Sequence, residues 1–201
     1  MPILNLMEKT EDTRGRILEA AEGLFIHYGF SKTTMAEIAE KCGMSAANIY
    51  RFFEGKEEIV AEMAYRHFRK VEESLREVVR RPGISPAERL EAFVLVMVRQ
   101  AHDLCCCNER MNEAVGYIQR KRAEMVDRHW ERIRSLLAEI LAEGNRTGEF
   151  DAPDVVDSAD AVLKATSFFQ APQCFVQLTL LELEESAGRV VRLLVKGLQK
   201  G

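Results

Sequence analysis

The sequence predicts an all-α protein, in which three N-terminal helices precede a larger helical region. Apolar residues recur at helical spacing along nearly the whole chain, and alternation with a period of two never persists. Glycine, proline and capping residues divide this pattern into segments of helical length. Of the 201 residues, 47% are hydrophobic and 30% are charged, a composition typical of a folded chain rather than a disordered one.

Local patterns define the first two helices. The apolar stripe of the first helix consists of Ile17, Ala20, Ala21, Leu24 and Phe25. Gly29 follows at the position where a left-handed residue would end that helix. Thr34-x-x-Glu37 is a capping-box pattern, so a second helix should begin there and bury Met35 and Ile38.

A glycine-containing turn at Cys42-Gly43 separates this helix from a third, for which Ser45 is a favourable N-cap. Ile49 and Phe53 would be buried on its inner face before Gly55 ends it. Two short helices joined by such a turn form a helix-turn-helix. If the third helix enters the major groove of DNA, its first turns face the base edges, and they carry Ala46, Ala47, Asn48 and Arg51.

These side chains have the chemistry to read bases. Asn48 can bond to an adenine edge, Arg51 can bind guanine O6 and N7, and Ala47 is small enough to approach a thymine methyl group. The alternative is that Asn48 and Arg51 are simply solvated. Thr33 and Thr34 lie at a helix N-terminus, where hydroxyl and free N–H groups favour a phosphate, and a capping role is compatible with that contact.

A long helix begins at Lys56 and continues to Arg81-Pro82-Gly83. The next should begin at Ser85-Pro86-x-Glu88, which combines a capping serine with proline and glutamate in the first turn. A break near Cys107-Asn108 and a short helix are expected after it. A longer helix should then stop at Gly144-Asn145.

Two further helices are expected, Val155–Phe169 and Leu178–Leu198, and their broad apolar faces make them the expected dimer interface. Apolar side chains between the helices of this region could together line an effector pocket, although any one of them alone is more often ordinary core. The candidates are Phe93, Met97, Met111, Trp130, Phe168 and Phe169.

Two motifs lie within a match that covers about a quarter of the chain: Gly29-Phe30-x-x-Thr33-Thr34-Met35-x-x-Ile38-Ala39 and Gly43-Met44-Ser45-x-x-x-Ile49-Tyr50-x-x-Phe53-x-x-Lys56-Glu57-x-Ile59. In these residues the sequence resembles the tetracycline-repressor (TetR) family of transcriptional regulators. The resemblance implies a repressor released from its operator by a small apolar or amphipathic effector. It also implies that Tyr50 contacts a phosphate or a base, and that Lys56 contacts a phosphate.

We therefore expect a helix-turn-helix DNA-binding domain over residues 10–56 and an effector-binding and dimerisation domain over residues 57–201. One short helix reads only a few base pairs, so specificity requires a homodimer on a palindromic double-stranded operator. No cofactor is expected. Residues 1–56 contain seven basic and eight acidic side chains, so non-specific attraction to DNA should be weak.

Other functions compete with this one. Cys105, Cys106 and Cys107, with His102 nearby, could bind a thiophilic metal or sense oxidants, although consecutive residues on a helix diverge too far to ligate one ion unless the helix breaks there. An enzyme is not expected, because nucleophile elbows and phosphate-binding loops are absent. A helical protein-interaction adaptor is a further alternative. Without a long apolar stretch or a signal-peptide pattern, the sequence predicts a cytoplasmic protein with reduced thiols and no membrane contact.

Overall fold

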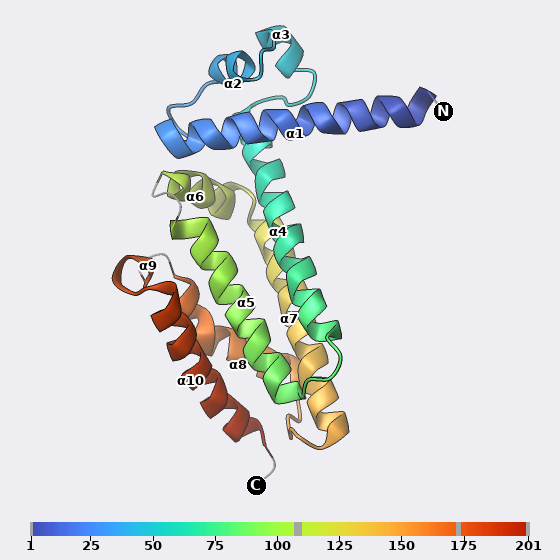
Figure 1. The fold of residues 1–201 in the computed structure, drawn as a ribbon, viewed down its shortest axis with the longest axis vertical. Coiled ribbons are helices and arrows are strands. Elements are labelled where there is room, and N and C mark those ends of the chain that lie inside the picture. The colour runs from blue at the N-terminus through green and yellow to red at the C-terminus, as the bar shows by residue number, and fades with distance from the viewer. Residues whose placement is uncertain (1, 107–109, 172–173, 200–201) are drawn as a thin grey trace. The chain divides into compact units, whose positions relative to one another are not determined.

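The computed structural model describes residues 2–106, 110–171 and 174–199. All regular elements in these ranges are helices, which confirms the all-α prediction (Figure 1). The chain divides into two compact units: residues 1–67 with 108–123, and residues 68–107 with 124–201. The long helix α4 (Lys56–Arg80) therefore contributes its first part to one unit and its second part to the other.

The first unit holds, besides the beginning of α4, four helices: α1 (Pro2–Tyr28), α2 (Met35–Lys41), α3 (Ala46–Ile49) and α6 (Met111–Lys121). Gly29 adopts the left-handed conformation, with φ of 90°, and ends α1 as expected. α2 packs against both α1 and α3, and α6 also packs against α1. Large buried side chains of this core include Ile17, Phe25, Ile38, Ile49, Phe53 and Ile59.

The second unit holds the rest of α4 and these elements: α5 (Pro86–Cys106), α7 (Ala123–Thr147), α8 (Val155–Thr166), the 3-10 helix η1 (Ser167–Gln170), α9 (Cys174–Gln177) and α10 (Leu180–Leu198). α10 packs against α5 and α8. Their shared core includes Leu75, Phe93, Val94, Leu137, Ile140, Val162, Leu183 and Val191. The apolar stripes read from the sequence therefore face one another in this unit.

α7 does not end at Gly144-Asn145, where the glycine suggests a stop, but continues to Thr147. Gly144 is buried, and a Cβ atom at this position would lie 2.0 Å from Cδ2 of Phe150. Glycine is therefore required here for side-chain packing rather than for chain reversal. The left-handed residue that follows the helix is Gly148, with φ of 78°.

Each of the two C-terminal helices differs from its predicted bounds at one end. α8 begins at Val155 as expected, because the Asp154 side chain caps it, but it ends at Thr166 and is followed by η1. α10 begins at Leu180 rather than Leu178, because Thr179 and Glu182 form a capping box. α9 was not predicted.

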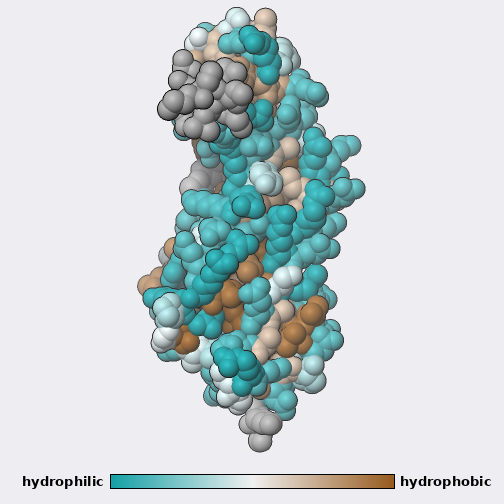
Figure 2. Space-filling model, turned by 90° about the vertical axis from the view of Figure 1, so that its right-hand side faces the viewer, coloured by the Kyte–Doolittle hydropathy of each residue, from teal (hydrophilic) through white to brown (hydrophobic). Residues whose placement is uncertain are grey.

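Several large apolar side chains on these C-terminal elements remain exposed: Val156, Phe168, Leu181 and Leu193. Figure 2 shows one side of the molecule, which is largely hydrophilic and carries hydrophobic patches in its lower half. In the part of the chain that the structure describes, no helix has the length and apolar character needed to cross a membrane.

Candidate DNA-binding site

α2 and α3 form the helix-turn-helix that the sequence predicts. The turn between them contains Gly43 in the left-handed conformation, with φ of 67°. Ser45 caps α3 by accepting a hydrogen bond from the Asn48 amide at 3.3 Å. Ile49 is fully buried and fixes the inner face of α3 against the core. α3 itself is only four residues long, and a hydrogen-bonded turn through Phe52 and Phe53 follows it.

The predicted base-reading residues lie on the outer face of α3 and in the turn that follows it. Ala46, Ala47 and Arg51 are exposed, Asn48 is half-buried, and Tyr50 is 54% exposed. Within the described residues, the Arg51 side chain makes no hydrogen bond or ion pair. The guanidinium of Arg51 is therefore available to a DNA base or phosphate.

Thr33 and Thr34 are used inside the protein. Thr33 is buried, and both its hydroxyl and its amide donate to the Gly29 carbonyl, at 2.9 and 3.3 Å. Thr34 forms a capping box with Glu37, whose carboxylate accepts hydrogen bonds from the Thr34 amide and hydroxyl at 2.8 Å. These hydrogen bonds lower the pKa of Glu37. Both threonines therefore make local contacts at the start of α2, and their role toward a DNA phosphate stays a prediction.

Lys56 and Arg14 also bind within the first unit. The Lys56 ammonium donates to the carbonyl oxygens of Phe30, Ser31 and Thr33 at 2.8, 3.0 and 2.9 Å. The Arg14 guanidinium donates to the Phe52 carbonyl at 2.7 Å and lies 4.2 Å from the centre of the Phe53 ring. Nothing in the sequence pattern pointed to these contacts, because their acceptors are backbone atoms.

The six candidate effector residues have different surroundings in the structure. Phe93, Met97 and Phe169 are buried together in the core of the second unit. Trp130 and Phe168 belong to the same unit but are 40% and 58% exposed, and Met111 belongs to the first unit. An open groove of about 620 Å³ lies between α4 and α5, and none of these six candidate residues lines it. The side chains at 105–107, and Cys107 as a whole, lie outside the described residues.

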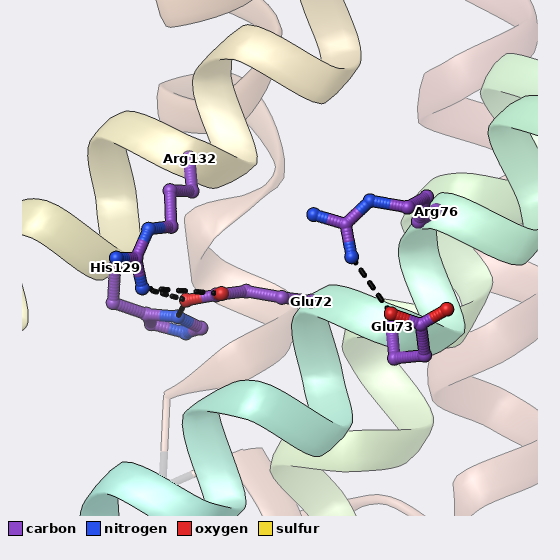
Figure 3. A network of polar contacts seen from close by, with 5 residues as sticks. All are labelled: Glu72, Glu73, Arg76, His129 and Arg132. Atoms are coloured by element: carbon purple, nitrogen blue, oxygen red, sulfur yellow. Dashed lines mark hydrogen bonds and ion pairs between the residues drawn. The ribbon is translucent and has the colours of Figure 1, made fainter.

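A buried polar network that the sequence analysis missed joins α4 to α7 (Figure 3). Glu72 is only 2% exposed, and its carboxylate lies 2.9 Å from Nδ1 of His129 and 3.3 Å from Nη1 of Arg132. The Phe68 ring stacks on the His129 ring at 4.1 Å. A sequence signal did exist, because Glu72 lies on the face of α4 that also carries Phe68 and Leu75, where an apolar residue is expected.

Burial lowers the pKa of His129, and its hydrogen bond to Glu72 opposes that effect without cancelling it. The unfolded chain therefore takes up a proton at this histidine at a higher pH than the folded chain does. We expect the free energy of unfolding to fall as the pH drops below about 6.5, by up to about 1.4 kcal/mol per pH unit. Urea denaturation between pH 5 and 7.5 measures this, and a His129→Gln variant should lose that part of the slope. If the free energy of unfolding depends on pH in the variant as it does in the wild type, His129 is not the source of this dependence.

Two family matches cover most of the chain. Residues 17–63 match the family described as "Bacterial regulatory proteins, tetR family". Residues 86–191 match the "Tetracyclin repressor-like, C-terminal domain". The first match contains α2, α3 and the start of α4, and the second extends from α5 into α10.

The chain is also similar in sequence to individual transcriptional regulators. The chain is 32% identical over 101 residues to the uncharacterized HTH-type transcriptional regulator MT2310 of Mycobacterium tuberculosis (strain CDC 1551 / Oshkosh), a match that spans 47% of this chain and about half (53%) of that protein. It is 28% identical over 162 residues to the HTH-type transcriptional regulator TtgR of Pseudomonas putida, with 72% of this chain and 73% of TtgR covered.

Solved structures share the fold. A TetR-family transcriptional regulator from Mesorhizobium loti MAFF303099 superposes with a TM-score of 0.76 at 19% identity, covering 95% of this chain and 98% of that one. The SmeT–triclosan complex superposes with a TM-score of 0.68 at 18% identity, covering 94% and 92%. Since the C-terminal match alone spans more than half of the residues, the chain belongs to the tetR family of bacterial regulatory proteins.

Proposed function

We propose that this protein is a sequence-specific DNA-binding transcriptional regulator that reads its operator with α3. The observation that carries the proposal is the asymmetry of that helix. Ile49 anchors one face in the core, while Asn48 on the helix is half-buried and Tyr50 and Arg51, in the turn directly after it, are exposed. A short helix fixed in this way can present a constant set of donors to the major groove.

Selection of DNA fragments by the purified protein tests the proposal. A random duplex library should yield a short palindromic motif, and affinity for that motif should fall as salt rises. A protein-interaction adaptor would enrich no sequence. That result would reject DNA reading by α3 and favour the adaptor.

Arg51 should carry specificity at one base pair. Arg51→Ala is expected to cost about 1–3 kcal/mol on the selected operator and to relax preference at a single position, because it removes one bidentate base contact. Binding to a panel of single-base operator variants measures this. Arg128→Ala, which removes an exposed arginine from α7, is the matched control and should change nothing. An equal loss on all sequences would identify Arg51 as a phosphate contact instead.

We also propose that the protein acts as a homodimer through α8 and α10. Each element carries large exposed apolar side chains, Val156 on α8 and Leu181 and Leu193 on α10. The two helices pack against each other within one chain, so together they offer a broad surface. A two-fold dimer would place two copies of α3 on successive turns of a palindromic site.

We propose further that the protein is a repressor released by a small apolar or amphipathic effector that binds the second unit. Family membership and the fold shared with the triclosan-bound SmeT support this class of ligand. Trp130 is the sole tryptophan and belongs to that unit, so it can report binding.

Triclosan and a series of medium-chain fatty acids serve as probes for this step. Those that change Trp130 fluorescence should also release operator DNA, and Trp130→Phe should lose the signal while keeping the release. If thiol oxidants alone release DNA, and a Cys105, Cys106, Cys107→Ser variant is unresponsive, the effector proposal is rejected.

A further inference from the structure

Three basic side chains of the first unit bind backbone carbonyls at three points of the helix-turn-helix: its entry, the turn between its two helices and its exit. Lys56 binds the segment that enters α2, Arg16 binds the end of α2, and Arg14 binds the segment that leaves α3. These three contacts have in common that their acceptors lie at the ends of α2 and just beyond α3. In each contact the charged side chain donates a hydrogen bond to a backbone carbonyl oxygen.

The Lys56 contact is the most complete of the three. An ammonium group has three N–H donors, and the three carbonyl acceptors at 2.8–3.0 Å use all of them. The ammonium also lies 4.9 Å from the centre of the Phe30 ring. No donor of Lys56 remains for a DNA phosphate in this arrangement.

The segment that Lys56 holds is short and sets the start of α2. It runs from Gly29 to Thr34, and three of its carbonyl oxygens converge on one point. Without a cation these oxygens would face one another with poorly compensated partial charges. Because Thr34 is the N-cap of α2, a shift of this segment moves the helix to which α3 is packed.

Arg14 and Arg16 hold the other two positions. The Arg16 guanidinium donates to the Cys42 carbonyl at 3.2 Å, where α2 ends. Arg14 donates to the Phe52 carbonyl at 2.7 Å, just beyond α3. The entry, the turn and the exit of the helix-turn-helix are therefore each tied to a cation from α1 or α4.

We propose that Lys56 is a positioning residue for DNA reading, which orients α2 and α3 by binding the 30–33 carbonyls, and that it is not a phosphate contact. The inference rests on the proposed reading of DNA by α3. It also accounts for a cation at the N-terminus of α4, where the helix dipole disfavours one, because the carbonyl oxygens and the nearby Glu37 and Glu113 carboxylates compensate the charge without DNA.

Two variants separate positioning from phosphate contact. Lys56→Arg keeps the charge and binds phosphate well, but a planar guanidinium cannot direct three N–H bonds from one nitrogen to three carbonyls. Lys56→Met removes both the charge and the donors. Affinities for the selected operator and for a scrambled duplex are measured across a salt series.

For a positioning residue, Lys56→Arg should weaken operator binding at least about tenfold, as expected for lost charged hydrogen bonds, and should lower the ratio of specific to non-specific affinity. Its salt dependence should match the wild type. If Lys56→Arg binds like the wild type while Lys56→Met shallows the salt slope by about one unit, Lys56 contacts phosphate and the proposal is overturned. Lys56→Arg keeps the charge of the side chain, so its specific and non-specific affinities still decide between the two roles if Lys56→Met does not fold.

Hydrogen exchange of the DNA-free protein gives a second readout. Amides in the 29–34 segment, including that of Thr33, should exchange faster in both Lys56 variants. Lys41→Met removes an exposed lysine at the end of α2 and is the matched control. Unchanged exchange in the Lys56 variants, or equal acceleration in the control, would overturn the proposal. If the wild type selects no operator, the proposed function fails, and the exchange result still decides whether Lys56 holds this segment.

Discussion

Replacing Leu193 with glutamate should convert the proposed dimer into monomers that bind the operator at least about 100-fold more weakly. Leu193 is 68% exposed within one chain, so the substitution leaves the core of that chain intact. In a two-fold interface the change introduces two carboxylates into apolar surroundings, at a cost of several kcal/mol that ordinary contacts do not offset. A lone α3 then reads only one half-site.

Sedimentation velocity and operator binding measure this outcome on the same sample. The neighbouring Leu194 is unsuitable, because it is half-buried and packs against the core of its own chain. Gln119→Glu adds the same charge at an exposed position on α6 and serves as the control. A Leu193→Glu protein that still sediments as a dimer would place the interface elsewhere.

Arg132→Met should lower the free energy of unfolding by about 3 kcal/mol, the low end of the cost of breaking a buried ion pair, because half of the Arg132 side chain is exposed. The substitution leaves the buried Glu72 carboxylate with His129 as its remaining partner in the network. Since His129 has a lowered pKa, it supplies little positive charge near neutral pH. Urea denaturation at pH 7.5 measures the loss.

A double variant shows whether the uncompensated charge causes the loss. Adding Glu72→Gln to Arg132→Met removes the carboxylate charge and should recover a substantial part of the lost stability, so the two changes should not be additive. Arg128→Met, on the exposed side of the same helix, should leave stability within about 0.5 kcal/mol of the wild type. Additive losses would mean that the network contributes packing rather than charge compensation.

The parts of the fold that the sequence predicted are those in which neighbours along the chain interact. The Thr34 and Glu37 capping box, the Ser45 cap and the left-handed Gly29 all involve residues within three or four positions. Such contacts leave a pattern in the sequence, because each partner must be a particular residue type at a fixed spacing.

Contacts between distant segments were not predictable in the same way. Glu72 and His129 lie 57 positions apart, and nothing near either residue specifies the other. The Lys56 acceptors are backbone carbonyls, which every residue possesses, so no sequence pattern marks them. Gly144 suggested a helix end because the sequence does not reveal that the Phe150 ring lies over it.

The internal use of Arg14, Arg16 and Lys56 has a consequence for how the protein searches a genome. Residues 1–56 contain seven basic side chains, and these three already hold carbonyl oxygens, so few remain to displace counterions from random duplex. Weak non-specific attachment shortens each sliding run and leaves more of the protein free in solution. Arrival at the operator should then occur mainly by repeated three-dimensional encounters, and fewer molecules would be sequestered by the excess of competing sites.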